Sequence, residues 1–144
     1  MGLKQPMQKI LEFFAENDHF ARHCGIDLLE VKPGWAKARM KIQPFHMNGA
    51  KTVHGGAIFT LADLTFAAAA NSWGQLALAI NTSMVFIKSA HGGILYAEAK
   101  ELSKNRQLGN YQVEITDGQQ LIAQFQGTAY RKDVSLIDKE RVDQ

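Results

Sequence analysis

The chain has 144 residues, of which 46% are hydrophobic and 21% charged, as is typical of one globular domain rather than a disordered chain. Its 16 basic and 14 acidic residues leave a formal net charge of +2, so the basic excess of a nucleic-acid-binding protein is absent. The single cysteine, Cys24, excludes an internal disulfide and a multi-cysteine zinc site. Without a run of about 18 apolar residues or the apolar core of a signal peptide, we expect a cytoplasmic protein with no membrane partner.

The first third of the chain predicts two helices and a β-hairpin. Apolar residues that recur at the i, i+3, i+4, i+7 spacing predict an amphipathic helix within residues 1–17, which we interpret as an N-terminal extension. A short helical segment over about 18–24 follows. Strands over 26–31 and 36–42 flank Lys32-Pro33-Gly34, where the Pro-Gly pair indicates a turn.

A loop over 43–53 leads into a helix over about 55–71 that is apolar on nearly every side, which predicts burial. The remaining chain predicts four strands, over about 77–88, 94–103, 108–117 and 120–130. The charged tail from 132 to 144 is expected to fray. This order predicts one α+β domain spanning 1–144, with a single antiparallel sheet curled around the buried helix.

Asp63 is the most unusual residue of that helix. A carboxylate among apolar side chains is costly unless it is paired or functional, and none of its helical neighbours at i±3 and i±4 is basic. Partial burial would raise its pKa and make it a better base. The structural alternative is an aspartate that faces solvent or hydrogen-bonds to a loop backbone.

His54-Gly55-Gly56 begins the same helix. A helix N-terminus presents free backbone N–H groups at the positive end of the helix dipole, and glycines let a ligand approach them closely. Such a site suits the polarisation of a carbonyl group. The alternative is that the two glycines only form the turn from loop to helix.

The spacing between His54 and Asp63 has a consequence for any shared site. Nine residues correspond to about 13 Å along a helix axis, so one chain cannot easily bring both to one carbonyl. If both act on one substrate, two chains must supply them. A dimer with two-fold symmetry that sets Asp63 of one chain beside Gly55 of the other would have two equivalent sites at its interface.

Other polar residues give weaker signals. Asn48, in the preceding loop, has an amide that suits holding a water or a carbonyl, but Asn-Gly is also an ordinary turn dipeptide. Lys104 and Arg106 near a strand end suit phosphate binding, or are simply solvated. His19 and His23 are spaced as a metal pair, but they lack the HExxH pattern and a third ligand, so we expect no metal site.

The run from Asn48 to Asp63 joins an upstream Asn, His-Gly-Gly and an acid nine positions later in an alanine-rich helix. This set resembles the signature of the hotdog-fold acyl-CoA thioesterases, most closely their phenylacetate-degradation (PaaI-like) branch, and the similarity covers about residues 18–131. The resemblance implies a strongly curved sheet wrapped around the 55–71 helix. It also implies a double-hotdog dimer, often paired again into a tetramer. The resemblance implies no cofactor, because coenzyme A is part of the substrate and product.

The implied reaction is hydrolysis of a phenylacetyl-type or medium-chain acyl-CoA to the free acid and CoA. By position, Asp63 is the general base or nucleophile, and the Gly55 N–H polarises the carbonyl across the dimer. His54 and Asn48 orient the thioester or the water. Substrate or CoA contacts are implied for Gly56, Asn81, Lys104, Asn105 and Arg106.

Three other interpretations compete with this one. A hotdog hydratase or dehydratase acting on enoyl thioesters also uses a histidine and an acid, but both must reach one substrate carbon. A non-catalytic hotdog module that binds acyl-CoA needs no unpaired carboxylate, so Asp63 argues against it. The third is an α+β domain with no activity that can be deduced.

Overall fold

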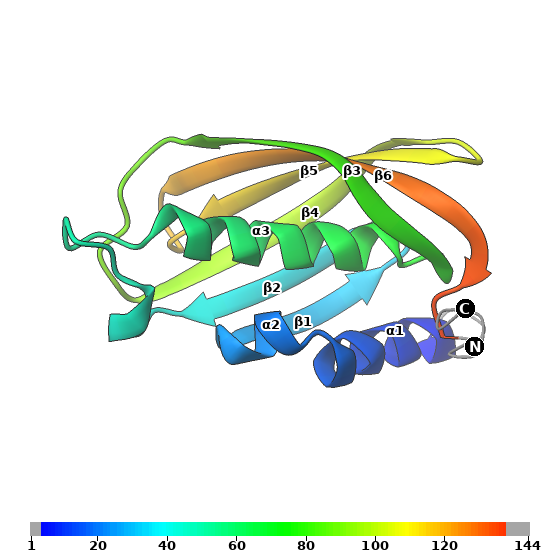
Figure 1. Ribbon diagram of the computed structural model, residues 1–144, viewed down its shortest axis with the longest axis horizontal. Helices are drawn as coiled ribbons and strands as arrows, with labels where there is room; N and C mark the ends of the chain where they lie inside the picture. Colours follow the sequence, from blue (N-terminus) through cyan, green and yellow to red (C-terminus); the bar gives the residue numbers. More distant parts are fainter. Residues whose placement is uncertain (1–3, 138–144) are drawn as a thin grey trace.

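The computed structural model describes residues 4–137, which form three α-helices, a short 3-10 helix and six strands (Figure 1). In chain order these are α1 (Lys4–Asn17), α2 (His19–His23), β1 (Ile26–Lys32), β2 (Trp35–Lys41), η1 (Pro44–His46), α3 (Gly55–Ala70), β3 (Gln75–Phe86), β4 (Ile94–Lys104), β5 (Leu108–Thr116) and β6 (Leu121–Ser135). None of the helices in this part of the chain is long and apolar enough to cross a membrane.

The six strands form one antiparallel sheet in the order β1-β2-β4-β5-β6-β3. Figure 1 shows the sheet curving around α3, with α1 and α2 beside β1. The two edge strands of the sheet are β1 and β3. The helix α3 connects β2, which lies next to one edge, to β3 at the other edge. The predicted α+β architecture, with one antiparallel sheet curled around the long helix, is therefore confirmed.

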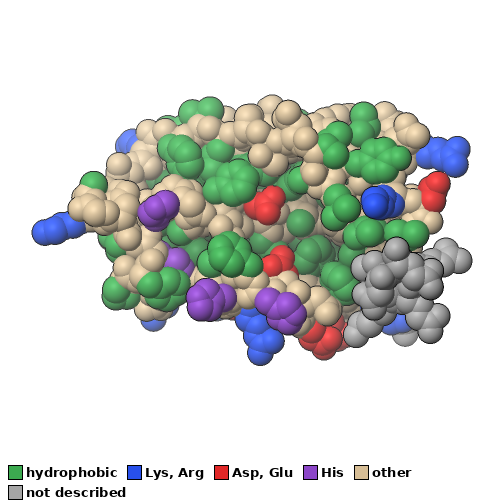
Figure 2. Space-filling model, in the orientation of Figure 1, with side chains coloured by type: hydrophobic (Ala, Val, Ile, Leu, Met, Phe, Trp, Pro, Cys, Tyr) green, Lys and Arg blue, Asp and Glu red, His purple; other side chains and the backbone are tan. Residues whose placement is uncertain are grey.

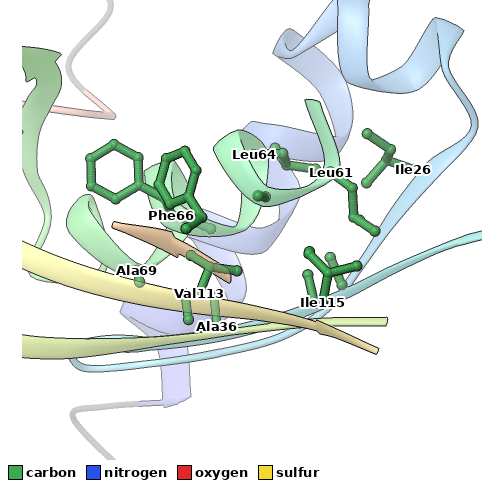
Figure 3. Packing of buried hydrophobic residues seen from close by; sticks show 14 of the residues in the cluster. Ile26, Ala36, Leu61, Leu64, Phe66, Ala69, Val113 and Ile115 are labelled. Atoms are coloured by element: carbon green, nitrogen blue, oxygen red, sulfur yellow. The ribbon is translucent and has the colours of Figure 1, made fainter. Parts of the chain in front are cut away.

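Small residues let α3 lie close to the sheet. The strands β2 and β4 present alanines at the centre of the concave face, all of them at most 1% exposed (Ala36, Ala38, Ala97, Ala99). Larger side chains fill the space on both sides of them, including Leu61 and Phe66 from α3 and Ile115 from β5 (Figure 3). As a result, α3 packs closely on the sheet, and nine of its sixteen residues are buried.

One face of α3 remains open in the single chain. Its partly or fully exposed residues follow helical spacing and include Gly56, Phe59, Thr60, Asp63 and Ala67. The helix is therefore not buried on all sides, although its sequence is apolar nearly all round. Figure 2 shows that hydrophobic side chains gather on the face of the molecule over α3, with isolated acidic side chains among them.

Two local predictions need correction. The loop over 43–53 contains the η1 turn, and β6 continues to Ser135, past the start of the expected fraying tail at 132. The extra length of β6 pairs with the start of β3, where Gln75 lies opposite Ser135. The next residue, Leu136, is buried and donates its N–H to the Gly74 carbonyl. The rest of that tail, 138–144, and residues 1–3 of the N-terminal extension lie outside the described residues.

Candidate active site

The N-terminus of α3 has one free backbone donor. His54 is the N-cap, and its Nδ1 accepts the Gly56 N–H at 2.8 Å. The N–H groups of Ala57 and Ile58 both donate to the His54 carbonyl, at 2.9 and 3.2 Å. Of the four N–H groups that a helix start leaves without helical partners, only that of Gly55 has no acceptor within the described residues. This N–H lies at the positive end of the helix dipole.

The structure gives each glycine of the motif a packing reason as well. A Cβ on Gly56 would lie 3.0 Å from Nδ1 of His54, the atom that caps the helix. A Cβ on Gly55 would lie 3.2 Å from Cζ of Phe86 on β3. Gly55, Phe86 and Lys88 are among the residues that line a cavity of about 240 Å³. The turn-forming interpretation of the motif therefore describes its contacts in the single chain, and the functional interpretation stays a prediction.

Asp63 lies half-buried on the open face of α3. Within the part of the chain described, its carboxylate has neither a hydrogen bond nor an ion pair. Burial raises the pKa of Asp63 above its ordinary value, and the negative charge of Asp18 raises it further. A carboxylate whose pKa is raised and which has no partner is suited to accept a proton.

One chain does not bring the two principal candidates together. Gly55 and Asp63 lie on the same straight helix, eight residues apart in the sequence, which is about 12 Å along its axis. A thioester carbonyl polarised by the Gly55 N–H therefore lies out of reach of Asp63 in the same chain. The separation expected from the sequence spacing persists in the folded chain.

Asn48 closes its own loop. Its Oδ1 accepts the N–H groups of Ala50 and Thr52, at 2.9 and 3.1 Å, and its Nδ2 donates to Oγ1 of Thr52 at 2.9 Å. The turn-forming alternative thus describes its contacts in the single chain, and one amide hydrogen remains for a ligand. The predicted role toward the thioester or water stays a prediction.

The predicted CoA contacts lie at the other end of α3. Lys104 places its ammonium 3.5 Å from the centre of the Trp73 ring, just past the end of the helix. Asn105 uses its side-chain oxygen to accept two N–H groups of its own turn. Arg106 is exposed and reaches Asp133 at 4.0 Å. All three residues are exposed, and none lies near Gly55 of the same chain.

Asn81 is a predicted substrate contact on β3. It lies opposite Thr128 of β6, whose sequence neighbours Gly127 and Ala129 are buried, and a Cβ on Gly127 would meet the Phe66 ring of α3. Since paired residues share a sheet face and successive residues alternate, Asn81 lies on the convex face, away from α3. There it lines a cavity of about 90 Å³.

The edge strand β3 exposes an apolar row. In and just after β3, five large apolar side chains are 46–61% exposed in the single chain (Leu78, Ile80, Val85, Phe86, Ile87). The outer edge of β3 also has no neighbouring strand among the described residues. An apolar, unpaired strand edge is a surface that associates with another strand.

Sequence reasoning missed two residues near the candidate site. Asp18 was read only as part of a short helix, yet its charge acts on Asp63. His46 was treated as a loop residue, but its ring is 3% exposed. No local pattern identifies these contacts, because each joins segments that only the fold brings together. No group of three or more potential metal ligands occurs within residues 4–137.

Comparison with known proteins gives a consistent family. A model described as the Thioesterase superfamily matches residues 50–123. A protein of Archaeoglobus fulgidus is 40% identical over 129 residues, covering 88% of this chain and 84% of that protein. Acyl-coenzyme A thioesterase PaaI of Escherichia coli is 36% identical over 118 residues, covering 81% of this chain and 84% of that protein.

The solved structures agree with these similarities. The structure of the E. coli PaaI protein from the phenylacetic acid degradation operon superposes with a TM-score of 0.88 at 32% identity, covering 92% of this chain and 98% of that one. The expected family, its enzymatic class and the curved sheet around one long helix are thereby confirmed. The chain belongs to the Thioesterase superfamily and has its hotdog fold.

Proposed function

We propose that this enzyme hydrolyses acyl-CoA thioesters to a free acid and CoA. The observation that carries the proposal is the pairing, on one helix of a thioesterase-superfamily protein, of a free N–H at Gly55 with an unpartnered carboxylate at Asp63. The first suits the developing oxyanion of a thioester under attack. The second suits the activation of water or direct attack.

Two routes are consistent with these groups. In the first, Asp63 takes a proton from water, the resulting hydroxide attacks the thioester carbon, and the carbon–sulfur bond breaks to release the CoA thiolate. In the second, the carboxylate itself attacks and displaces the thiolate, and water then hydrolyses the resulting anhydride. In both, the Gly55 N–H stabilises the carbonyl oxygen, and His54 and Asn48 orient the thioester or the water.

The site is completed by a second copy of the chain. Because Gly55 and Asp63 are about 12 Å apart on one straight helix, one substrate carbonyl needs Gly55 from one protomer and Asp63 from its partner. The exposed apolar edge of β3 supports a two-fold dimer that joins the two sheets edge to edge. Two equivalent sites then lie between the helices, and two such dimers can pair again into a tetramer.

The relatives and the cavity beside Gly55 support an assignment of the substrate class. The E. coli relative is named an acyl-coenzyme A thioesterase, and this PaaI protein comes from the phenylacetic acid degradation operon. We assign phenylacetyl-type or medium-chain acyl groups, since Phe86 and Ile58 line the cavity beside Gly55. In this assignment, Gly56 contacts the substrate, and the turn 104–106 contacts the CoA nucleotide through the exposed side chain of Arg106. Asn81 faces away from α3 and takes no part in it.

The test measures free thiol released from a panel of acyl-CoAs: phenylacetyl, hydroxyphenylacetyl, benzoyl, and short, medium and long chains. Phenylacetyl or medium-chain substrates should give the highest kcat/KM, and Asp63→Asn should lower turnover by at least about 10²-fold. The comparison includes an enoyl-CoA, because hydration without thiol release would contradict a thioesterase. Tight acyl-CoA binding without turnover by the wild type would contradict an enzyme and favour a binding module.

The Asp63→Asn variant is expected to fold. A pKa raised in the folded chain means that ionisation of Asp63 opposes folding, so its contribution to stability is lost as pH rises through that pKa. At neutral pH the neutral asparagine removes this cost. Thermal unfolding at pH 7 should therefore show a melting temperature no lower than that of the wild type, and a lost activity then reports chemistry.

A further inference from the structure

His46 is the one buried histidine among the five in the sequence, with 3% of its surface exposed. It ends η1, in the loop that leads to the N-terminus of α3. Both of its ring nitrogens have partners. Nδ1 lies 2.9 Å from the Gln43 backbone nitrogen, and Nε2 lies 2.7 Å from the Cys24 carbonyl oxygen at the end of α2.

These partners determine the tautomer of the ring. The Gln43 N–H can only donate, so Nδ1 carries a lone pair and no proton. The Cys24 carbonyl can only accept, so Nε2 carries the proton. A neutral ring with its proton on Nε2 therefore joins η1 to the end of α2. The adjacent Phe45 ring packs on it, with ring centres 4.1 Å apart.

The backbone of His46 continues this link to the candidate site. Its carbonyl accepts the His54 N–H at 2.7 Å. The His54 carbonyl in turn accepts the N–H groups of Ala57 and Ile58. The Gly55 N–H belongs to the peptide unit that begins with this carbonyl, so its direction is determined by bonds on both sides of His54. His46 is the only one of these partners whose side chain is anchored outside the loop and helix.

We propose that His46 is a positioning residue for the Gly55 N–H, acting through His54. The neutral ring holds η1 on α2, and η1 then presents the carbonyl that fixes the His54 backbone. This role rests on the proposed function of Gly55 in polarising the thioester. His46 itself does not touch the substrate.

The first test separates the two ring bonds by substitution. His46→Asn places a side-chain oxygen near the position of Nδ1 and loses the bond to Cys24. His46→Gln places a donor near Nε2 and loses the bond to Gln43, and His46→Leu loses both. We expect His46→Leu to lower kcat by about 10²-fold, the order expected for a site displaced by about 1 Å.

A change in kcat without a change in KM distinguishes a positioning role from general destabilisation of the fold. An N–H that acts in the transition state changes kcat while KM stays within about two-fold. At least one of Asn and Gln should restore kcat by about tenfold over Leu. The matched control is His91→Leu, an exposed turn residue whose change should leave both constants unaltered. A folded His46→Leu with wild-type kcat, or with no rescue by either amide, would overturn the proposal.

Nuclear magnetic resonance tests the proposal without activity. Nitrogen-15 shifts of the wild type should show a protonated Nε2 and an unprotonated Nδ1 for His46, and His46→Leu should move the Gly55 amide resonance more than that of Gly118 in a distant turn. A His46 proton on Nδ1, or an unmoved Gly55 resonance, would overturn the positioning role. If these signatures appear but no acyl-CoA is hydrolysed, the proposed function fails and the structural link stands.

Discussion

The free N–H of Gly55 can be removed without breaking a hydrogen bond of the helix. Gly55 is the first residue of α3, the position at which proline fits a helix because its nitrogen has no helical acceptor there. His54, which would precede the proline, already has φ −60° and ψ 133°, the extended conformation that proline requires of its neighbour. Gly55→Pro therefore deletes the proposed carbonyl-polarising donor while α3 remains formed.

The expected loss is that of one oxyanion donor, a fall in kcat of about 10²–10³-fold, or about 2.7–4 kcal/mol of transition-state stabilisation. Gly55→Ala is the matched control, because it keeps the N–H and places a Cβ in the same space, 3.2 Å from Cζ of Phe86. The Phe86 ring is 54% exposed, so it can shift by the few tenths of an ångström required. We expect the alanine variant to lose less than about tenfold, or 1.4 kcal/mol.

The assay is thiol release at saturating phenylacetyl-CoA, with thermal unfolding of both variants measured beside it. The restricted backbone of alanine or proline stabilises the folded chain by about 0.4–1 kcal/mol where the native conformation fits, so neither variant should melt far below the wild type. A folded Gly55→Pro with kcat within about tenfold of Gly55→Ala would refute the role of this N–H.

Three further predictions use other parts of the structure. Asp18→Asn keeps a helix-capping side chain but removes a charge that raises the pKa of Asp63. The acidic limb of the pH profile of kcat/KM should therefore move to lower pH. A limb that does not move would count against Asp63 as the base. Asn71→Ala removes three hydrogen bonds of a residue that is 3% exposed, and it should lower the free energy of unfolding, measured in urea, by about 2–4 kcal/mol. Asn110→Ala, on the exposed sheet face, should lower the free energy of unfolding by less than about 1 kcal/mol. Equal losses would show that burial is not the cause. Arg106→Ala removes an exposed cation and should raise KM for acyl-CoA severalfold with kcat unchanged; an unchanged KM would exclude it from CoA binding.

Most of the fold was predictable because its signals are local. Hydrophobic periodicity and turn residues located every strand and the long helix to within a few residues. The exception is the end of β6, where charged residues suggested a fraying tail. Residues up to Ser135 are held as a strand by pairing with the start of β3, about sixty positions away in sequence, and no local pattern reports such a contact.

Candidate site residues could be proposed from the sequence, but their contacts could not. Asp63 stood out because a carboxylate in an apolar helix violates a local rule. By contrast, Asn48 and Asn105 carry hydrogen bonds of their own turns, which a motif does not distinguish from ligand binding. The link from Cys24 through His46 to His54 joins three segments, so only the folded chain shows it.

The claim that one site uses two chains is tested by mixing inactive variants. Gly55→Pro and Asp63→Asn each inactivate both sites of a homodimer, but a mixed dimer contains one site with an intact Gly55 and an intact Asp63. Random mixing after unfolding and refolding makes half of the dimers mixed, so thiol release should recover to about one quarter of the wild-type rate. Recovery to that level supports a site shared between protomers. A mixture that stays as inactive as its two components, with mixed dimers demonstrated by mass spectrometry, would contradict it.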